Sequence, residues 1–236
     1  MMKKNRLQYM LEEGQKVILF TSTTSNEGKS FNAANLAASF AFMGKKTVVV
    51  GLDIRNPRLT KLFNISNKDG GITEYLAAPS STDLLKLYQQ TEVSPNLFVL
   101  PCGTIPPNPT ELVARPSLEK AIQMLKEHFD YIILDTPPVG VVADAVILSK
   151  ETSGVMFVVR KGRSTQESVR ASIETLKMAN ANVLGFVMTD ASGERRYYNK
   201  YGRYGRYGKY GKYGKYGYYN RYSYYGYNKQ SEQDKG

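Results

Sequence analysis

Short apolar runs rich in β-branched residues alternate with amphipathic stretches along most of the chain. The apolar runs, each expected to form a buried strand, occupy residues 17–20, 47–50, 97–100, 131–134, 155–159 and 183–188. The amphipathic stretches, each expected to form a helix, occupy residues 30–42, 82–90, 117–128, 143–149 and 165–178. Buried strands separated by helices are typical of a mostly parallel sheet that is covered on both faces. The sequence therefore predicts an α/β fold of three layers, with helices on either side of a central sheet.

The connections between these elements carry local signals. Residues 56–81 are predicted to be loop-rich with short helical turns, and the PPNP segment around Pro106 is predicted to be a rigid connection. Three hydroxyl residues are predicted to cap helices, namely Thr110, Ser117 and Thr165. The regular pattern ends near Ser192. We therefore predict one domain over residues 1–191 and a separate tail over residues 192–236.

The tail is dominated by tyrosine, glycine and basic residues. It holds fourteen of the eighteen tyrosines. From Arg195 onward it has eleven Lys or Arg residues against two acidic ones, a net charge of +9 out of +11 for the whole chain. Beyond Ala191 the sequence contains no Leu, Ile, Val, Met or Phe, so the tail has little to bury and is predicted to be disordered. The domain itself is nearly neutral, and its partners cannot be deduced from the basic character of the chain.

Several features bear on the cellular compartment. Cys102 is the single cysteine, which excludes an intrachain disulfide and fits a reducing cytoplasm. The N-terminal MMKKNRLQYMLEEG is polar and lacks the apolar stretch of a signal peptide. No run approaches the roughly 20 apolar residues of a membrane-spanning helix. We expect a cytoplasmic protein whose association with a membrane is peripheral or made through a partner.

The segment TSTTSNEGKS follows the first predicted strand and opens a helix. Strand, loop and helix in this order place successive backbone amides around an anion at a helix N-terminus. In such a loop Lys29 would reach the terminal phosphates of a nucleotide, and the Ser30 hydroxyl would bind magnesium. Thr23 occupies the place of the usual leading glycine. The motif predicts a nucleotide-binding loop, and the alternative is a glycine-containing turn with a solvated lysine.

Two aspartates follow predicted strands, Asp53 in VVVGLDIRNP and Asp135 in YIILDTPP. In an open parallel sheet, ligands bind beyond the carboxyl ends of the strands. Both carboxylates should then face the phosphates, where magnesium takes oxygen ligands. Either aspartate alone could simply form a turn. Together with the loop, they predict a site for a nucleotide with magnesium.

These motifs resemble those of the bacterial tyrosine kinases, or BY-kinases, of capsule and exopolysaccharide synthesis, which belong to the deviant P-loop ATPases. TSTTSNEGKS resembles the Walker A motif of the family, GLDIRNP its Walker A′ motif and ILDTPPVG its Walker B motif. GTIPPNPTELVARP is similar to a stretch that precedes Walker B in the family, and the C-terminal tyrosine cluster separates these kinases from sister ATPases. The resemblance covers essentially the whole chain. It implies a P-loop NTPase fold and ATP-dependent protein-tyrosine kinase activity.

The resemblance also implies the roles of individual residues. ATP and Mg²⁺ would be bound, with Lys29, Asp53 and Asp135 as catalytic residues and with Ser30, Asp53 and Asp135 at the metal. The implied nucleotide-binding residues are Asn26, Glu27, Gly28, Lys29, Ser30 and Phe31. The implied phosphoacceptors are Tyr197, Tyr198, Tyr201, Tyr204, Tyr207, Tyr210, Tyr213, Tyr216, Tyr218, Tyr219, Tyr222, Tyr224, Tyr225 and Tyr227.

Three places depart from the pattern of the family. Ser25 and Asn26 stand where the family usually has Pro-Gly, which is expected to alter the geometry of the loop without loss of binding. Gly51 stands where the family has the first of two aspartates, the one assigned as the base for the tyrosine proton. Either Asp53 takes that role, or general base catalysis matters little in a loose phosphoryl-transfer transition state. KKNRLQYML covers only part of a Glu-rich and Arg-rich helix that joins subunits in the family, so the start is trimmed, or the membrane domain is missing from this chain, or assembly is weaker.

The partners implied by the resemblance are other copies of the chain, a membrane protein and a phosphatase. Subunits of the family form a ring and phosphorylate the tails of one another. A membrane-bound polysaccharide chain-length regulator activates them, a tyrosine phosphatase opposes them, and no specific nucleic acid is involved. The implied location is the inner face of the cell membrane, reached through a transmembrane partner or through a membrane domain missing from this chain.

Two other functions remain open. A partition or positioning ATPase of the same superfamily would use the nucleotide as a switch without kinase activity. Such ATPases usually carry a second lysine near the start of Walker A, and this loop has none between Phe20 and Gly28. Alternatively, the tail could bind single-stranded nucleic acid, because its basic residues are interleaved with aromatic ones.

Five further residues receive structural interpretations. His128 is predicted to lie at the surface near the end of a helix, and Cys102 to pack in the core. Arg160 and Lys161 follow a strand and are interpreted as a solvated pair, with contact to phosphate or to another subunit as the alternative. Asp144 is considered as a residue that shapes the loop after Walker B.

Overall fold

The computed structural model describes residues 16–191. The predicted tail, residues 192–236, lies outside the described residues together with its phosphoacceptor tyrosines, and so does the start of the chain, residues 1–15. The domain boundary near Ser192 and the disorder of the tail therefore stay predictions.

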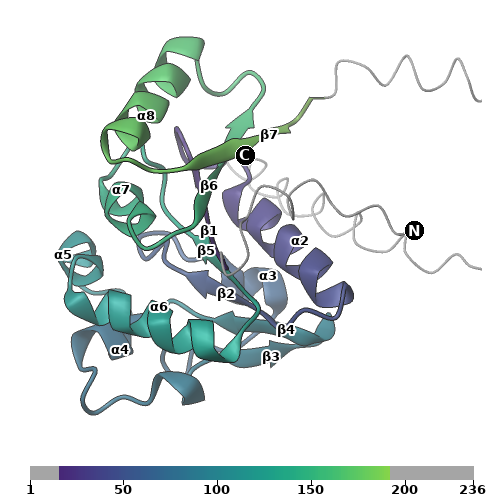
Figure 1. Cartoon of the computed structure of the whole chain (residues 1–236), viewed down its shortest axis with the longest axis vertical. Coiled ribbons are helices and arrows are strands. Elements are labelled where there is room, and N and C mark those ends of the chain that lie inside the picture. Colours follow the sequence, from purple (N-terminus) through teal and green to yellow (C-terminus); the bar gives the residue numbers. More distant parts are fainter. Residues whose placement is uncertain (1–15, 192–236) are drawn as a thin grey trace, which may run out of the picture. The chain divides into compact units, whose positions relative to one another are not determined.

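A seven-stranded sheet forms the centre of the domain, with the strand order β3-β4-β2-β5-β1-β6-β7 (Figure 1). The strands are β1 (Val17–Ser22), β2 (Thr47–Gly51), β3 (Gln89–Thr91), β4 (Ser94–Leu100), β5 (Tyr131–Asp135), β6 (Gly154–Arg160) and β7 (Val183–Thr189). Neighbouring strands are parallel except for the β3–β4 pair, which is antiparallel. The predicted α/β fold with a mostly parallel sheet is confirmed.

Helices cover both faces of the sheet. The helices α2 (Lys29–Phe42) and α3 (Leu59–Phe63) pack on one face. The other face is covered by α4 (Ile72–Ala77), α5 (Pro109–Val113), α6 (Pro116–His128), α7 (Asp144–Ser149) and α8 (Gln166–Met178). The short α3 and α4 confirm the helical turns predicted within residues 56–81. These layers make the three-layer architecture that the sequence predicts.

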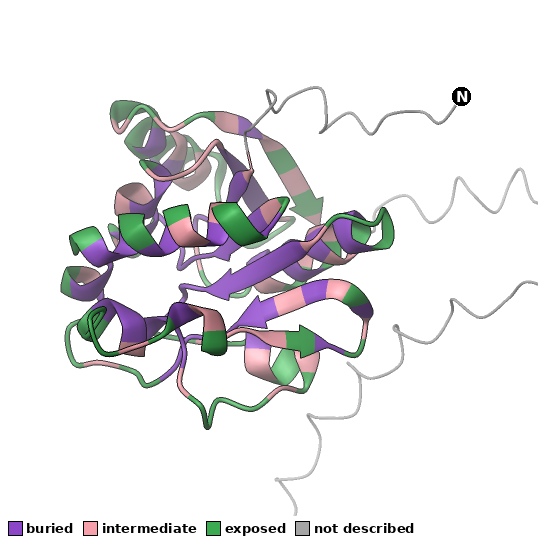
Figure 2. Ribbon diagram, turned by 60° about the horizontal axis from the view of Figure 1, so that its bottom comes forward, coloured by how far each residue is buried: buried purple, intermediate pink, exposed green. Residues whose placement is uncertain are grey.

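The core consists of two apolar clusters, one on each side of the sheet. Along β1, Val17 and Leu19 join the cluster under α4–α8, whereas Ile18 and Phe20 join the cluster under α2. Successive residues of a strand point to opposite faces, so a strand that is buried on both sides needs an unbroken apolar run. Figure 2 shows the consequence, with buried strands between helices whose inner sides are buried and whose outer sides are exposed.

The edge strand β7 is less well covered than the others. The exposed fraction is 58% for Phe186 and 63% for Met188, and both side chains lie on the α8 face, next to Phe157 and Val159 of β6. β7 pairs only with β6 within residues 16–191. It is therefore the strand of the parallel part that is held by the fewest neighbours.

The helix predicted over residues 82–90 is wrong. A 3₁₀ turn, η1 (Leu84–Lys86), is followed by β3, in which Gln89 and Gln90 pair with β4. The spacing of the leucines fits a helix, and Leu84 and Leu87 are indeed buried. The polar residues after them nevertheless pair with the exposed edge of β4, and this tertiary contact outweighs local periodicity.

Two of the three predicted helix caps are wrong. Proline opens both α5 and α6, so these helices begin one residue before Thr110 and Ser117. Thr110 and Ser117 therefore lie inside their helices, and the Ser117 hydroxyl donates to a backbone oxygen of α4. The third prediction is confirmed, because Thr165 Oγ1 accepts a hydrogen bond of 3.2 Å from the amide of Ser168.

The sheet brings three chain segments together at its carboxyl edge. In the register of the central strands, Phe20 pairs with Asp135, and Asp135 pairs with Gly51. The ends of β5 and β2 are therefore level, and β1 runs two residues further to Ser22. The loop that follows β1, the segment that follows β2 and the side chain of Asp135 consequently lie next to one another.

Candidate active site

The loop between β1 and α2, residues 23–28, has two residues in the left-handed region of backbone conformation. These are Asn26, with φ at 65°, and Gly28, with φ at 97°. Asparagine tolerates this conformation better than most residues with a side chain. Asn26 thus adopts a backbone conformation typical of glycine at a position where the family usually has glycine.

The carbonyl groups of this loop are bound from outside. Five consecutive carbonyl oxygens, of residues 24–28, each accept a hydrogen bond from a donor beyond that stretch. In the order of the carbonyls, the donors are Ser22 Oγ at 2.7 Å, Arg163 Nε at 3.2 Å, Arg160 Nη1 at 3.1 Å, Thr189 Oγ1 at 2.9 Å and the Asn32 amide at 3.0 Å. Within residues 16–191, no oxygen accepts from the amides of residues 25–28. A loop with its carbonyls bound and its amides free is suited to hold an anion.

Glu27 supports the loop from behind. Its side chain is fully buried. Glu27 Oε2 accepts from the amide of Thr24 at 2.9 Å, and Oε1 accepts from the amide of Arg160 at 3.2 Å and from the hydroxyl of Ser164 at 2.8 Å. The carboxylate is thus committed to these three donors. Glu27 was predicted among the nucleotide-binding residues, and only its backbone remains available for that role.

Lys29 is the first residue of α2 and is only 5% exposed. Burial lowers the pKa of its ammonium group, and the carboxylates of Asp53 and Asp135 oppose this shift. The predicted catalytic residues Lys29, Asp53 and Asp135 are therefore brought together by the fold. The predicted Phe31 lies in the same first turn with its ring 60% exposed, so its proposed contribution to binding rests on its backbone amide.

The two carboxylates at the strand ends are both buried. Asp135 is 1% exposed, and its Oδ1 has no hydrogen-bond partner within the described residues. Burial raises the pKa of Asp135 to about 7; the neighbouring Ser30 hydroxyl opposes this shift, and the charge of Asp53 adds to it. Burial also raises the pKa of Asp53, against the effect of Lys29. A buried carboxylate oxygen without a partner, beside a serine hydroxyl, fits an oxygen-liganded cation such as Mg²⁺.

The titration of Asp135 should be visible in the stability of the protein without nucleotide or metal. The pKa of Asp135 is raised in the folded state, so between about pH 4 and pH 7 the folded state binds more protons than the unfolded state, and stability falls as the pH rises. Asp135→Asn removes this contribution. In urea titrations, the variant should therefore gain stability relative to the unmodified protein between pH 5 and pH 8. An equal difference in unfolding free energy at both pH values would contradict the assignment.

Gly51 lies next to Asp135 in the sheet and has little free space around it. A Cβ atom at this position would lie 3.2 Å from the Cys102 amide nitrogen and 3.5 Å from a Leu59 methyl group. An aspartate here would require the backbone near Cys102 to move by a few tenths of an ångström. Of the two aspartates that the family has in Walker A′, this site therefore has only Asp53.

Two arginines that were not among the predicted site residues bind carbonyl groups of the loop. Arg160 donates to the carbonyl of Asn26 and forms an ion pair of 2.6 Å with Asp190. The interpretation of Arg160 and Lys161 as a solvated pair is thus wrong for Arg160, whereas Lys161 is exposed. Arg163 donates to the carbonyl of Ser25. Because β6 is the neighbour of β1 in the sheet, the segment after β6 necessarily lies beside the loop after β1, but this pairing is not written in the local sequence.

Asp144 lies at the start of α7 and is 1% exposed. It accepts a hydrogen bond of 2.5 Å from the Thr110 hydroxyl, and its Oδ2 lies 3.6 Å from Arg55 Nε. Arg55 in turn donates to Thr110 at 2.7 Å. Asp144 therefore joins α5, α7 and the segment after β2, rather than only shaping its own loop.

His128 and Cys102 take the structural positions predicted for them. His128 is the exposed last residue of α6. Cys102 is buried, and burial raises the pKa of its thiol to about 12. A thiol with such a pKa stays protonated and packs as an apolar group.

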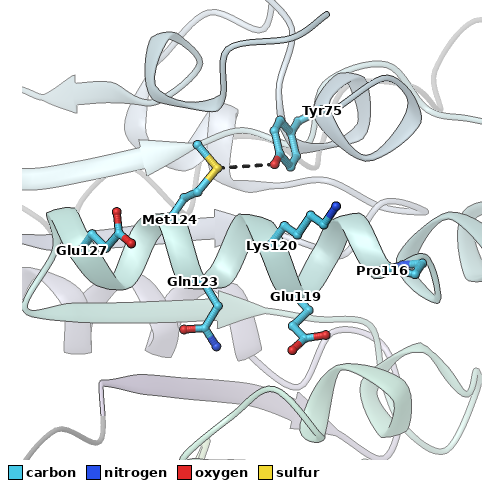
Figure 3. A pocket seen from close by; sticks show the side chains of 7 residues that line it. All are labelled: Tyr75, Pro116, Glu119, Lys120, Gln123, Met124 and Glu127. Carbon is cyan, nitrogen blue, oxygen red and sulfur yellow. Dashed lines mark hydrogen bonds between the residues drawn. The ribbon is translucent and has the colours of Figure 1, made fainter. Parts of the chain in front are cut away.

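A shallow groove of about 490 Å³ lies away from these residues, between α4 and the outer side of α6 (Figure 3). It is lined by Tyr75, Pro116, Glu119, Lys120, Gln123, Met124 and Glu127. The Tyr75 hydroxyl donates to Met124 Sδ at 3.4 Å across its floor. The groove contains none of the loop or strand-end residues and is not the predicted nucleotide site.

Comparisons with known proteins identify the family of the chain. A family model described as the AAA domain matches residues 15–183. Tyrosine-protein kinase CpsD of Streptococcus agalactiae is 34% identical over 198 residues, which cover 84% of this chain and 85% of CpsD. The chain belongs to the bacterial tyrosine kinase family. The enzyme class predicted from the sequence, protein-tyrosine kinase, is confirmed at the level of this family.

Solved structures of a tyrosine kinase domain and of a P-loop ATPase share the fold of this bacterial tyrosine kinase. The kinase domain of the Escherichia coli tyrosine kinase ETK matches with a TM-score of 0.72 and 30% identity, over 77% of this chain and 70% of the other. The septum site-determining protein MinD of Pyrococcus horikoshii, complexed with Mg-ADP, matches with a TM-score of 0.64 and 23% identity, over 77% and 72% of the two chains. The latter similarity concerns the P-loop ATPase fold alone. Among the helices within residues 16–191, none is long and apolar enough to cross a membrane.

Proposed function

We propose that this kinase transfers the terminal phosphoryl group of ATP to tyrosines of its own tail, mainly on a neighbouring copy. The observation that carries the proposal is the loop of residues 23–28. Its carbonyls are held outward beside Lys29, Asp53 and Asp135. An anion with the charge of a nucleotide phosphate is the ligand that such a site favours. The tail provides fourteen phenols in the same chain.

The residues of the site divide the work of phosphoryl transfer. The free amides of residues 25–28 and the ammonium group of Lys29 stabilise negative charge on the transferred group. The Ser30 hydroxyl and the Asp135 carboxylate would hold Mg²⁺, which fits a magnesium site made of one or two carboxylates, phosphates and water. When bound there, Mg²⁺ would neutralise charge on the phosphate oxygens.

The proton of the tyrosine needs an acceptor only late in the reaction. A free phenol has a pKa of about 10, so it loses its proton as the new oxygen–phosphorus bond forms. Asp53 is the acceptor we favour. Its carboxyl is buried and its pKa is raised, which makes it a stronger base than an exposed aspartate. The alternative, transfer without a general base, would leave the rate nearly unchanged in Asp53→Asn if metal binding is preserved.

Phosphorylation would change the electrostatic character of the tail step by step. Each phosphate adds about −1.5 to −2 charges at neutral pH. About five phosphates would therefore cancel the tail's charge of +9. A basic segment that binds acidic surfaces would become a neutral one that releases them. Phosphorylation of several tails would also weaken contacts within a ring of subunits.

The cellular setting that we propose follows family membership. The chain would act in capsule or exopolysaccharide synthesis and export as part of a ring of identical subunits. A membrane-bound chain-length regulator would activate it at the inner face of the membrane, and a tyrosine phosphatase would reverse the reaction. These partners would explain how a domain without a spanning helix in its described part acts at a membrane.

Mapping of phosphate in a mixture of two chains tests the proposal. Unlabelled protein is incubated with ATP, Mg²⁺ and an isotope-labelled Lys29→Met chain, and both are analysed by mass spectrometry. We expect phosphotyrosine within residues 197–227 of the labelled chain, because a neighbouring copy supplies the active site. Phosphate only on the unlabelled chain would mean transfer within one molecule. Unmodified tails, even with the cytoplasmic segment of an activator added, would favour a nucleotide-switch ATPase instead.

A further inference from the structure

Arg58 joins two parts of the site that are separate in the sequence. It directly precedes α3, at the end of the segment that carries Asp53. Its Nη2 donates a hydrogen bond of 2.8 Å to the side-chain oxygen of Asn26 in the phosphate loop. The side chain of Arg58 is exposed, as is that of Asn26, so their contact lies at the solvent side of the loop.

The charge of Arg58 acts on the groups around the phosphate position. Burial lowers the pKa of Lys29 and Arg58 adds to this effect, whereas burial raises the pKa of Asp53 and of Asp135 and Arg58 opposes the rise. The hydrogen bond to Asn26 holds the guanidinium beside the loop whose amides would bind the phosphates. Lys29 belongs to α2, whereas Arg58 lies in the segment after β2, so the two cations come from different elements.

The guanidinium of Arg58 has a weak partner that an anion can replace. Within residues 16–191, no carboxylate lies within 4 Å of it, and its bond is to a neutral amide. Arginine commonly binds phosphate through two parallel hydrogen bonds between opposite charges, whereas its bond to Asn26 is a single one to an uncharged oxygen. Arg55, three residues earlier, differs in this respect because Thr110 and Asp144 already bind it.

We propose that Arg58 is a further catalytic residue, which leaves Asn26 when ATP binds and contacts the terminal phosphate. The inference rests on the proposed function, because it requires ATP in the loop. Related switch ATPases usually carry a second lysine near the start of Walker A, and this chain has no lysine between Phe20 and Gly28. Arg58 supplies that second charge from the segment after β2.

The chemical step defines where Arg58 acts. The tyrosine oxygen forms a bond to the terminal phosphorus, and the bond from that phosphorus to the bridging oxygen of ATP breaks. The electron pair of the broken bond stays on ADP, and the phenolic proton passes to Asp53 or to water. Arg58 takes up no atom or electron. It stabilises charge on the terminal oxygens, which are absent from ADP.

Comparison of ATP with ADP therefore tests the inference. The affinities of the full chain for Mg-ATP and Mg-ADP are measured by calorimetry, and tail phosphorylation is measured in a single turnover. We expect Arg58→Ala to weaken ATP binding by about tenfold while leaving ADP binding within about twofold, and to slow transfer by about 10²-fold to 10³-fold. Arg58→Lys should keep part of the normal ATP affinity and part of the normal transfer rate, because lysine retains the positive charge. Lys61→Ala removes an exposed cation three residues away and should change neither.

A second variant separates a direct role of Arg58 from a role through the loop. Asn26→Gly keeps the left-handed backbone possible and removes the side-chain partner of Arg58. If Arg58 contacts phosphate, this variant should keep the ratio of ATP affinity to ADP affinity of the unmodified protein, whatever its rate of transfer. If Arg58 only positions the loop, Asn26→Gly should lose affinity for ATP relative to ADP as Arg58→Ala does, and this result would overturn the inference. Equal losses of ATP and ADP affinity in Arg58→Ala would also overturn it, whereas an unmodified chain that binds neither nucleotide would overturn the proposed function.

Discussion

Lys29→Met should reduce tail phosphorylation by at least about 100-fold, because it removes a preorganised positive charge from the transferred group. The ammonium group of Lys29 is buried beside Asp53 and Asp135, where electrostatic interactions are stronger than in water. Methionine retains an unbranched apolar side chain of similar length. The fold should therefore survive while the charge is lost.

Anti-phosphotyrosine detection and intact-mass measurement would follow the reaction, with circular dichroism to verify the fold. Lys45→Met is a matched control, because Lys45 is exposed beyond the C-terminal end of α2, at the other end of the helix from the loop. The control should keep the full rate. Phosphotyrosine formed by purified Lys29→Met alone at a tenth of the normal rate or more would exclude the assigned role.

Glu27→Ala should damage both stability and nucleotide binding. The change leaves two amides and one hydroxyl without the carboxylate that now accepts from them, in a fully buried place. Loss of a buried hydrogen-bond partner of this kind costs about 1–3 kcal/mol, so we expect the free energy of unfolding to fall by roughly 3 kcal/mol. The loop would then lose its fixed shape, and the affinity for ATP should drop by about 10-fold to 100-fold, since roughly 1.4 kcal/mol corresponds to tenfold.

Urea unfolding and ATP titration would measure the two effects. Glu27→Gln should have an unfolding free energy and an ATP affinity between those of the unmodified protein and of Glu27→Ala. Its amide oxygen can still accept a hydrogen bond, while its NH₂ group faces a donor. Glu174→Ala serves as the control, since Glu174 is an exposed residue of α8 that, among residues 16–191, forms an ion pair only with Lys177. A Glu27→Ala protein whose unfolding free energy lies within about 0.5 kcal/mol of the original would show that the carboxylate does not support the loop.

The central strands could be predicted because each is buried on both faces. β1, β2 and β5 read as unbroken apolar runs, and such runs leave few alternatives. β3 could not be predicted, since its residues Gln89 to Thr91 are polar and are strands only through pairing with β4. The caps predicted at Thr110 and Ser117 are wrong because the preceding prolines start the helices earlier.

The candidate site also contains residues that could be predicted from the sequence and residues that could not. Lys29, Asp53 and Asp135 follow strands or open a helix, so their convergence at the carboxyl edge follows from the topology of a parallel sheet. The groups that hold the loop carbonyls could not be foreseen. Arg160 and Arg163 come from more than 130 residues later in the chain. Only the neighbouring positions of β1 and β6 bring them to the loop, and no local pattern encodes that pairing.

The position of β7 at the edge of the sheet has a consequence for heat inactivation. Thr189 ends this strand and Asp190 follows it; the first binds the Glu27 carbonyl, and the second holds Arg160 on the Asn26 carbonyl. Edge elements with exposed apolar side chains open locally at lower free energy than the interior strands. When the end of β7 opens, two of the five carbonyls lose their donors while the central strands remain paired. Without nucleotide, the enzyme should therefore lose activity at a lower temperature than the one at which its domain unfolds. Bound ATP should bring these two temperatures together.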